Sequence, residues 1–165
     1  MRMSAKAEYA TRAMAQLAAA QTSGAGRVRA EDLGAAQDIP VAFLLAILGE
    51  LRAEGLVASH RGREGGYSLA RPADEVTLAD IIRTIDGPLA SVHGLSLSEV
   101  TYQGPAAPLG DVWMALRAAV RSVLEHVTLA DLVAGRLPAD VDRLASEYRR
   151  QERRRGRWSA SGDST

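Results

Sequence analysis

The feature that most constrains the fold is a pair of short helical patterns on either side of a tight turn. Residues 30–36 (AEDLGAA) begin with carboxylates, which stabilise the start of a helix. After a turn at residues 37–39, Pro40 stands where its fixed φ presets a first helical residue. The pattern VAFLLAILGELRAE over residues 41–54 predicts a second helix, which Gly55 ends. Two short helices joined in this way are typical of a helix-turn-helix, although other three-helix bundles share the pattern.

The residues that follow predict a β-hairpin. Residues 56–59 and 67–70 have the character of short strands, and the segment HRGREGG between them is polar and rich in glycine. Glycines permit the positive φ angles of a protruding turn. A basic hairpin directly after a helix-turn-helix predicts a wing, with its tip along a phosphate backbone or in a minor groove of DNA.

Two further helices are predicted around this segment. Residues 4–20 place small and apolar side chains on one face, with Ser4 as the N-cap. Residues 77–86 begin with Thr77 and carry Asp80 three positions later, a variant of the capping box. The same TLAD sequence recurs at Thr128, and we interpret both copies as helix starts.

The longest helical pattern covers residues 109–132, after a loop-rich connector at residues 88–108. An apolar stripe runs along it, formed by Val112, Leu116, Val120, Val123, Leu124 and Val127. A stripe of this length needs a partner helix, either from the same chain or from a second subunit.

These patterns predict a mostly α fold with one small β-hairpin wing, divided into three parts. Residues 1–72 form a winged helix-turn-helix domain, and residues 73–135 hold the connector and the long helix. Residues 136–165 form a charged tail that begins as a helix at Ala139 and is disordered near its end. The tail carries an Arg-rich run that is either a solvated segment or an electrostatic arm attracted to phosphates.

Composition excludes several classes of protein. The sequence has no cysteine, which removes disulfides, thiolate nucleophiles, Cys-based zinc sites and the usual iron–sulfur ligands. It has neither a signal-peptide pattern nor an apolar run long enough for a membrane span, so we expect a cytoplasmic protein without membrane contact.

The formal net charge is zero, but the charges are unevenly distributed. Lys and Arg number nine against seven Asp and Glu over residues 1–72, five against eleven over residues 73–148, and six against two over residues 149–165. A nucleic-acid site would therefore lie at the basic ends.

No pattern of catalytic residues is present. The sequence lacks a nucleophile–base signature and a phosphate-binding glycine loop, so we expect no enzyme and no cofactor. Three histidines, His60, His93 and His126, lack the spacing of metal ligands. We interpret them as ordinary polar residues, and a His-based metal sensor is kept as an alternative.

Three stretches together resemble the Rrf2 family of bacterial transcription regulators, which includes an iron–sulfur cluster regulator. They read SAKAEYATRAM, IPVAFLLAILGELRAEGLVASHRGREGGYSLAR and VTLADIIRTIDGP, and the wing sequence RGREGGYSLAR is the most specific part. The resemblance covers residues 1–135. It implies a homodimer on double-stranded DNA at a palindromic site, held together by the long helix and its six stripe residues. Each subunit would place a recognition helix in the major groove and a wing in the minor groove.

The positions of several residues in these elements make them candidate DNA contacts, with ordinary surface charge as the alternative for the two wing arginines. They are Ser4 and Lys6 at the front of the first helix, Val41, Ala42, Phe43, Leu45 and Ala46 of the recognition helix, and Arg61, Gly62 and Arg63 of the wing. Tyr67 is expected to anchor the hairpin in the core, and packing is favoured over base contact for Phe43. Relatives commonly carry polar base-reading residues where this chain has Ala42, Leu45 and Ala46. Apolar side chains contact thymine methyls but do not read guanine, so specificity would depend on the wing and on DNA shape.

A second departure from the family concerns sensing. Relatives that hold an iron–sulfur cluster place three cysteines in the segment that matches residues 89–108, and this chain has none. We therefore expect a cysteine-less regulator, acting as a repressor, that responds to a signal without a cluster. A small-molecule effector bound in the acidic, loop-rich residues 86–111 is favoured, with a simple connector as the alternative. A winged-helix module that binds only protein is the other functional hypothesis.

Overall fold

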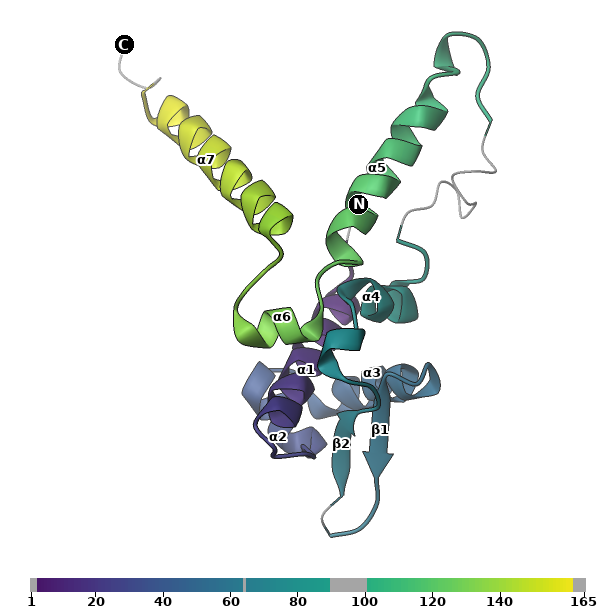
Figure 1. Cartoon of the computed structure of the whole chain (residues 1–165), viewed down its shortest axis with the longest axis vertical. Helices are drawn as coiled ribbons and strands as arrows, with labels where there is room; N and C mark the ends of the chain where they lie inside the picture. The colour runs from purple at the N-terminus through teal and green to yellow at the C-terminus, as the bar shows by residue number, and fades with distance from the viewer. Residues whose placement is uncertain (1–2, 64, 90–100, 162–165) are drawn as a thin grey trace.

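The computed structural model describes residues 3–63, 65–89 and 101–161, with side chains up to residue 153. A body of packed helices carries a β-hairpin at one end, and helices α5 and α7 project from the other end (Figure 1). The elements in chain order are α1 (Ala5–Thr22), α2 (Ala30–Gln37), α3 (Val41–Ala53), β1 (Val57–His60), β2 (Gly66–Leu69), η1 (Ala73–Glu75), α4 (Leu78–Asp86), η2 (Gly104–Ala106), α5 (Leu109–Leu124), α6 (Leu129–Ala134) and α7 (Ala139–Ser161). The predicted class, mostly α with a small β-hairpin, is confirmed.

The helix-turn-helix forms as predicted, with a tight turn between α2 and α3. Asp38 adopts a left-handed conformation with φ 52°, and the Ile39 N–H donates to the Gly34 carbonyl over 2.9 Å. A Cβ atom on Gly34 would lie 2.8 Å from the Ile39 carbonyl oxygen, so only glycine fits this close approach. Apolar side chains of α1, α2 and α3 fill the core below the turn, among them Met14, Leu17, Leu33, Leu44, Ile47, Leu48 and Leu51.

The wing is an antiparallel pair displaced by one residue from the predicted strands. Val57 pairs with Leu69, and His60 pairs with Gly66. Val28 adds a third short segment through an isolated antiparallel bridge to Tyr67, with both backbone N–H groups donating across it. Tyr67 packs against the core, which confirms its predicted role as the hairpin anchor.

The predicted single helix over residues 109–132 is wrong. Helix α5 ends at Leu124, and α6 starts after Thr128, whose hydroxyl accepts the Asp131 N–H while the Asp131 carboxylate accepts the Thr128 N–H. Thr77 and Thr128 form an antiparallel bridge, and the Leu129 N–H donates to the Val76 carbonyl over 3.0 Å. Because the second capping box and this bridge hold the chain against the body, the helix does not continue. Both TLAD sequences start helices, as predicted.

The tail begins as a helix at Ala139, as predicted, but the helix is longer than expected. It forms α7, which continues to Ser161 and has 23 residues against 16 in α5. Alternating charges on one face add modest stability to the helix, since Arg143 pairs with Asp140 and Glu147 at three- and four-residue spacing. Residues 162–165, where disorder is also predicted, lie outside the described residues.

Within the described part of the chain, no single helix is both long and apolar enough to cross a membrane. Only α2 and α3 taken together reach that length and composition, and the pair is bent by 112°.

Candidate DNA-binding interface

Helix α3 presents one buried and one exposed face. Leu44, Ile47, Leu48 and Leu51 are buried in the core. The other face leaves Ala42, Phe43, Leu45 and Ala46 exposed, with Val41 half-buried. All five predicted recognition-helix residues thus reach the surface at least in part, and the surface that they form is apolar.

Phe43 combines the two roles that the sequence leaves open. Its ring meets Tyr9 of α1 edge-on, with ring centroids 5.8 Å apart and planes at 84°. The side chain nevertheless stays exposed, so the contact fixes its orientation without covering it.

Arg12 links α1 to the end of α2 at this site, and the sequence analysis did not identify it. Its Nε donates to Gln37 Oε1 over 3.3 Å, and its Nη2 donates to the Gln37 carbonyl at the end of α2. The guanidinium lies 5.7 Å from the Tyr9 ring centroid and also pairs with Glu8. A cation at the end of a helix stabilises its last carbonyls, so Arg12 fixes the turn that positions α3. No pattern in the sequence separates Arg12 from an ordinary exposed arginine.

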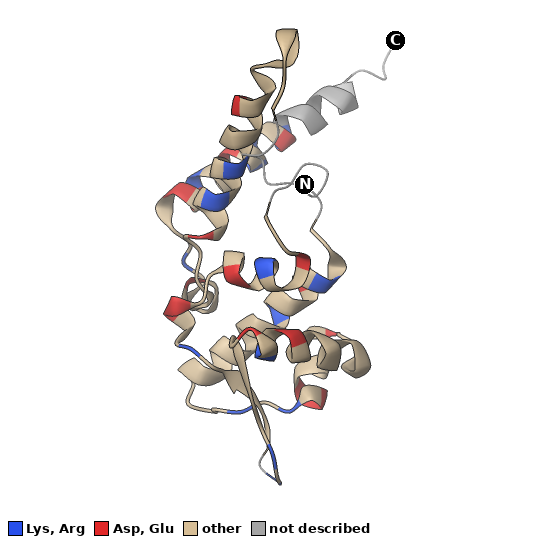
Figure 2. Cartoon of the chain, turned by 90° about the vertical axis from the view of Figure 1, so that its right-hand side faces the viewer, with Lys and Arg blue, Asp and Glu red and all other residues tan. Residues whose placement is uncertain are grey.

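The wing tip carries the predicted residues Arg61, Gly62 and Arg63, all exposed. The turn is closed by the Gly65 N–H, which donates to the Gly62 carbonyl over 2.9 Å. Arg29, which precedes α2 and is not part of the hairpin, stabilises the tip because its Nη2 donates to the Arg63 carbonyl over 3.0 Å. Basic positions lie on the hairpin and near its base (Figure 2). Glu64, which follows Arg63 in the sequence, lies outside the described residues.

The other two predicted contact residues, Ser4 and Lys6, form contacts within their own chain. Lys6 Nζ pairs with both carboxylate oxygens of Glu50 in α3, at 2.6 and 2.7 Å. Ser4 accepts the Ala7 N–H as the predicted N-cap and donates its hydroxyl to Asp86 at the end of α4. The start of α1 lies at the end of the body away from the wing tip (Figures 1 and 2). A DNA contact by Ser4 or Lys6 therefore stays a prediction, and Glu50 is a partner that the sequence did not indicate.

The predicted dimerisation stripe is only partly exposed. Val112 and Leu116 expose 54% and 47% of their surface, and Val120 and Val123 are half-buried. Leu124 and Val127 are buried within their own chain, so their place in a dimer interface stays a prediction. Leu124 packs against Ala79 and Ile82 of α4, because α5 ends on the body at this point.

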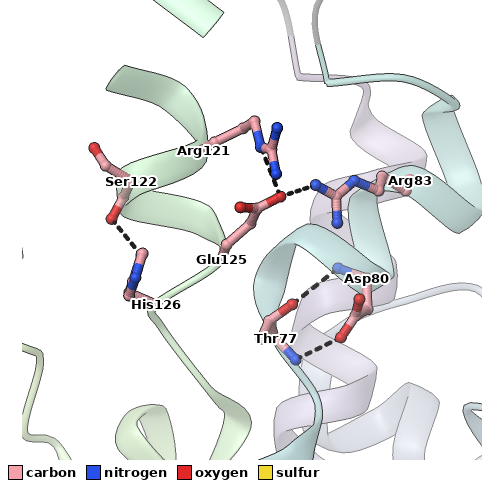
Figure 3. Close-up of polar contacts among 7 residues, drawn as sticks. All are labelled: Thr77, Asp80, Arg83, Arg121, Ser122, Glu125 and His126. Atoms are coloured by element: carbon pink, nitrogen blue, oxygen red, sulfur yellow. Dashed lines mark hydrogen bonds and ion pairs between the residues drawn. The ribbon is translucent and has the colours of Figure 1, made fainter. Parts of the chain in front are cut away.

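Ion pairs fix α5 to α4 at this junction. Arg121 Nε donates to Glu125 Oε1 over 2.9 Å, and Arg83 of α4 donates to the same oxygen (Figure 3). These hydrogen bonds, that of Arg121 first, lower the pKa of the Glu125 carboxyl below its ordinary value. The orientation of α5 relative to the DNA-reading body thus depends on a charge cluster as well as on apolar packing.

Two hollows lie beside this junction. One of about 540 Å³ opens between α1 and α4, lined by Met3, Ser4, Ala5, Ile82, Asp86, Pro88 and Leu89. Another of about 320 Å³ lies between α4 and α5, lined by Arg83, Gly87, Pro88, Leu89, Arg117 and Arg121. Both include the first part of the predicted effector segment, whose residues 90–100 lie outside the described residues.

The histidines of the described residues do not form a metal site. His60 hydrogen-bonds to Ser68 Oγ over 3.0 Å, His126 faces the Ser122 carbonyl, and His93 lies outside the described residues. Residues 3–63, 65–89 and 101–153 bring together no group of three His, Asp or Glu side chains with metal-site geometry.

Comparisons with known proteins place this geometry among regulators. A profile of the Rrf2 family, described as "Iron-dependent Transcriptional regulator", matches residues 3–135. A Mycobacterium tuberculosis protein named as an HTH-type transcriptional regulator is 57% identical over 163 residues, covering 99% of this chain and all of the relative. The HTH-type transcriptional regulator IscR of Cereibacter sphaeroides is 33% identical, covering 81% of this chain and 87% of its own. Among solved structures, CymR, the global cysteine regulator of Bacillus subtilis, aligns with a TM-score of 0.69 and 32% identity, covering 81% of this chain and 97% of its own.

Proposed function

Since the chain belongs to the Rrf2 family of transcriptional regulators, we propose that it is a homodimeric repressor that binds a palindromic operator in the cytoplasm. The observation that carries this proposal is the exposed face of α3 beside a basic wing. Its relatives and structural neighbours are transcriptional regulators rather than enzymes, and it is a DNA-binding regulator like them. A dimer that occupies promoter DNA represses by excluding the polymerase, without any further contact.

Base reading would depend on contacts unlike those of polar recognition helices. Phe43, Leu45 and the alanines of α3 offer methyl and ring surface, which suits the C5-methyl groups of thymine in the major groove. Arg61 and Arg63 would enter the minor groove or lie on its phosphates, where narrow A·T-rich grooves attract arginine. We therefore expect an operator with A·T-rich positions under the wing and thymines under α3.

The dimer would form through the exposed part of the α5 stripe. Val112 and Leu116 expose about half of their surface in the single chain, which is unusual for aliphatic side chains on a regular stripe. Burying each would contribute roughly 1.5–3 kcal/mol. A palindromic site would require the two-fold axis at α5 to place the two α3 helices about 34 Å apart, one helical turn of DNA.

An iron–sulfur cluster does not fit this chain, although the family description names iron. Cluster irons are held mostly by thiolates, and the sequence has no cysteine. We propose instead that a small molecule binds beside the α4–α5 junction, at the hollows that contain Pro88 and Leu89. A ligand there would change the angle of α5, and with it the spacing of the recognition helices.

Selection of bound fragments from random genomic DNA tests this function. We expect recovery of a common palindrome with two half-sites about one helical turn apart. The control is a variant with Arg61→Glu and Arg63→Glu, which should recover no common sequence. Recovery of no common sequence by the unmodified protein would favour the protein-interaction module, whose wing never meets DNA. Equal recovery of one palindrome by both proteins would show DNA reading that does not depend on the wing arginines.

A further inference from the structure

Helix α7 is the one large element of the described chain whose packing is unexplained. It extends away from the body (Figure 1), and within the described residues it packs extensively against no other element. The family profile ends at residue 135, before this helix begins. Most of the stability of a helix in a protein comes from packing of its apolar face, so a partner surface is needed to explain α7.

The helix carries an apolar stripe on one face. Val141, Leu144 and Tyr148 repeat at three- and four-residue spacing, and Leu137 extends the pattern before the helix starts. Leu144 and Tyr148 expose 45% and 62% of their surface. The opposite face is occupied by the ion pairs that involve Arg143 and Arg149. The apolar face is therefore separate from the charged one and available for packing.

This stripe matches the exposed stripe of α5 in an antiparallel arrangement. Both stripes span the same length, from residue 112 to 123 on α5 and from residue 137 to 148 on the α7 side. A single register aligns Val112 with Tyr148 and Leu116 with Leu144, and it brings Val120 within one residue of Val141. Spacings of three and four residues are those at which two helices interlock side chains.

The charges agree with the same orientation. Helix α5 has Asp111 near its start and Arg117 and Arg121 in its second half. Helix α7 has acidic residues in its first turn and Arg149, Arg150 and Arg153 further along. Antiparallel packing places the acidic start of each helix beside the basic half of the other, and it also pairs the helix dipoles favourably.

Within one chain the two helices do not meet in this way. Helices α5 and α7 diverge from the body (Figure 1), because the segment between them is held against the body by the Thr77–Thr128 bridge and by Leu129, which is fully buried. Helix α5 also has a strip of small residues, Ala115, Ala119 and Ser122, beside its apolar stripe. It therefore offers surface for more than one neighbouring helix.

We propose that α7 packs antiparallel against α5 of a second copy of this chain, so that α7 of each subunit in the dimer covers α5 of the other. The proposal rests on the proposed dimer and specifies its contacts: the exposed α5 stripe meets α7 of the partner, and the strip of small residues on α5 is left to face the partner's α5. In this arrangement α7 and the partner's α5 bury the stripes that both leave exposed in the single chain.

The absence of cysteine from the sequence permits a direct test. Two full-length variants, Leu116→Cys and Leu144→Cys, are mixed under reducing conditions to allow subunit exchange and then oxidised. We expect a disulfide-linked heterodimer between the two variants. The matched control replaces Leu144→Cys by Ser146→Cys, which lies on the opposite face of α7 and should give little or no cross-link. Equal cross-linking of both pairs, or none in a mixture that sediments as a dimer, would overturn the proposal.

A second measurement distinguishes the possible outcomes. Leu144→Asp should raise the dimer dissociation constant by roughly tenfold or more, because a symmetric dimer loses two such contacts. A disulfide that forms only within one chain, in the Leu116→Cys, Leu144→Cys double variant, would assign α7 to its own α5 and overturn the proposal. An unchanged dimer with weaker DNA binding would make α7 a DNA-contacting arm and also overturn it. Failure of the proposed function would instead appear as a wild-type protein that is monomeric or selects no DNA sequence.

Discussion

The residues of the candidate DNA interface differ in how rigidly the backbone around them is fixed. This difference decides how much each is expected to contribute to DNA affinity. Arg61 directly follows β1, whereas Arg63 lies at the turn, although Arg29 holds the Arg63 backbone carbonyl. A side chain on a fixed backbone loses less freedom when it binds, so Arg61 should contribute more than Arg63.

We expect Arg61→Ala to weaken operator binding by about 1–3 kcal/mol and Arg63→Ala by less. Titration of labelled operator at several salt concentrations measures both the affinity and the number of phosphate contacts. Lys6→Ala is an informative comparison, since Lys6 pairs with Glu50 in the free protein. Equal and small losses for the two wing variants, with each salt slope reduced by about one, would show that the wing contacts only the backbone.

Several residues of the site were predictable, and others were not. The exposed face of α3 and the wing arginines follow from periodicity and from the glycine-rich turn. Arg12 and Glu50 were missed, because their roles depend on contacts between residues far apart in the sequence: Arg12 with Gln37, and Glu50 with Lys6. Hydrophobic spacing carries no information about such pairs.

Among the elements, the short helices and the hairpin were predicted closely, but the end of α5 was not. The apolar pattern continues through Val127 because that residue packs into the body after the helix has ended. Apolar periodicity therefore could not distinguish a continuous helix from a helix followed by a buried turn. The second TLAD sequence was the available signal, since a capping box marks a helix start wherever it occurs.

The α6 capping box makes a pH-dependent contribution to stability. Hydrogen bonds from the backbone N–H and the hydroxyl of Thr128 lower the pKa of Asp131 below its ordinary value. A depressed carboxyl pKa stabilises the fold above the unfolded-state pKa of about 3.9, and this contribution is lost as pH falls through the lower folded-state value. Asp131→Asn should therefore destabilise the protein to urea at pH 7 and make little difference near pH 2. A destabilisation that is equal at both pH values would mean that the charge has no role.

The α5 stripe is expected to decide the oligomeric state. Leu116→Asp or Val120→Asp should yield monomers or insoluble protein, since a charge would enter the proposed interface. Met114→Asp is the matched control, because Met114 is exposed on the same helix but lies off the stripe. Sedimentation velocity measures the outcome, and a normal dimer for both stripe variants would place the interface elsewhere.

At the scale of the whole molecule, the absence of cysteine decides whether the protein can hold an iron–sulfur cluster. We expect protein purified without oxygen to contain no iron–sulfur cluster and to bind its operator in the presence of a chelator, because no thiolate is available to hold iron. The visible absorption spectrum, with iron and sulfide assays, measures the first part. A brown protein with stoichiometric iron and sulfide would contradict it, and binding that a chelator abolishes and one metal restores would contradict the second.

The bridge between Thr77 and Thr128 has a topological consequence. It joins the chain just before α4 to the chain just before α6, so the projecting arm that holds α5 lies between two points of the chain that pair with each other on the body (Figure 1). Helix α4 has nine residues and is therefore about 14 Å long, a gap that a linker of a few residues spans. The projecting arm could thus be excised and replaced by such a linker, leaving a closed body with its DNA-reading surface intact. Dimer assembly and DNA reading would then be separable by protein engineering, even though their segments alternate along the sequence.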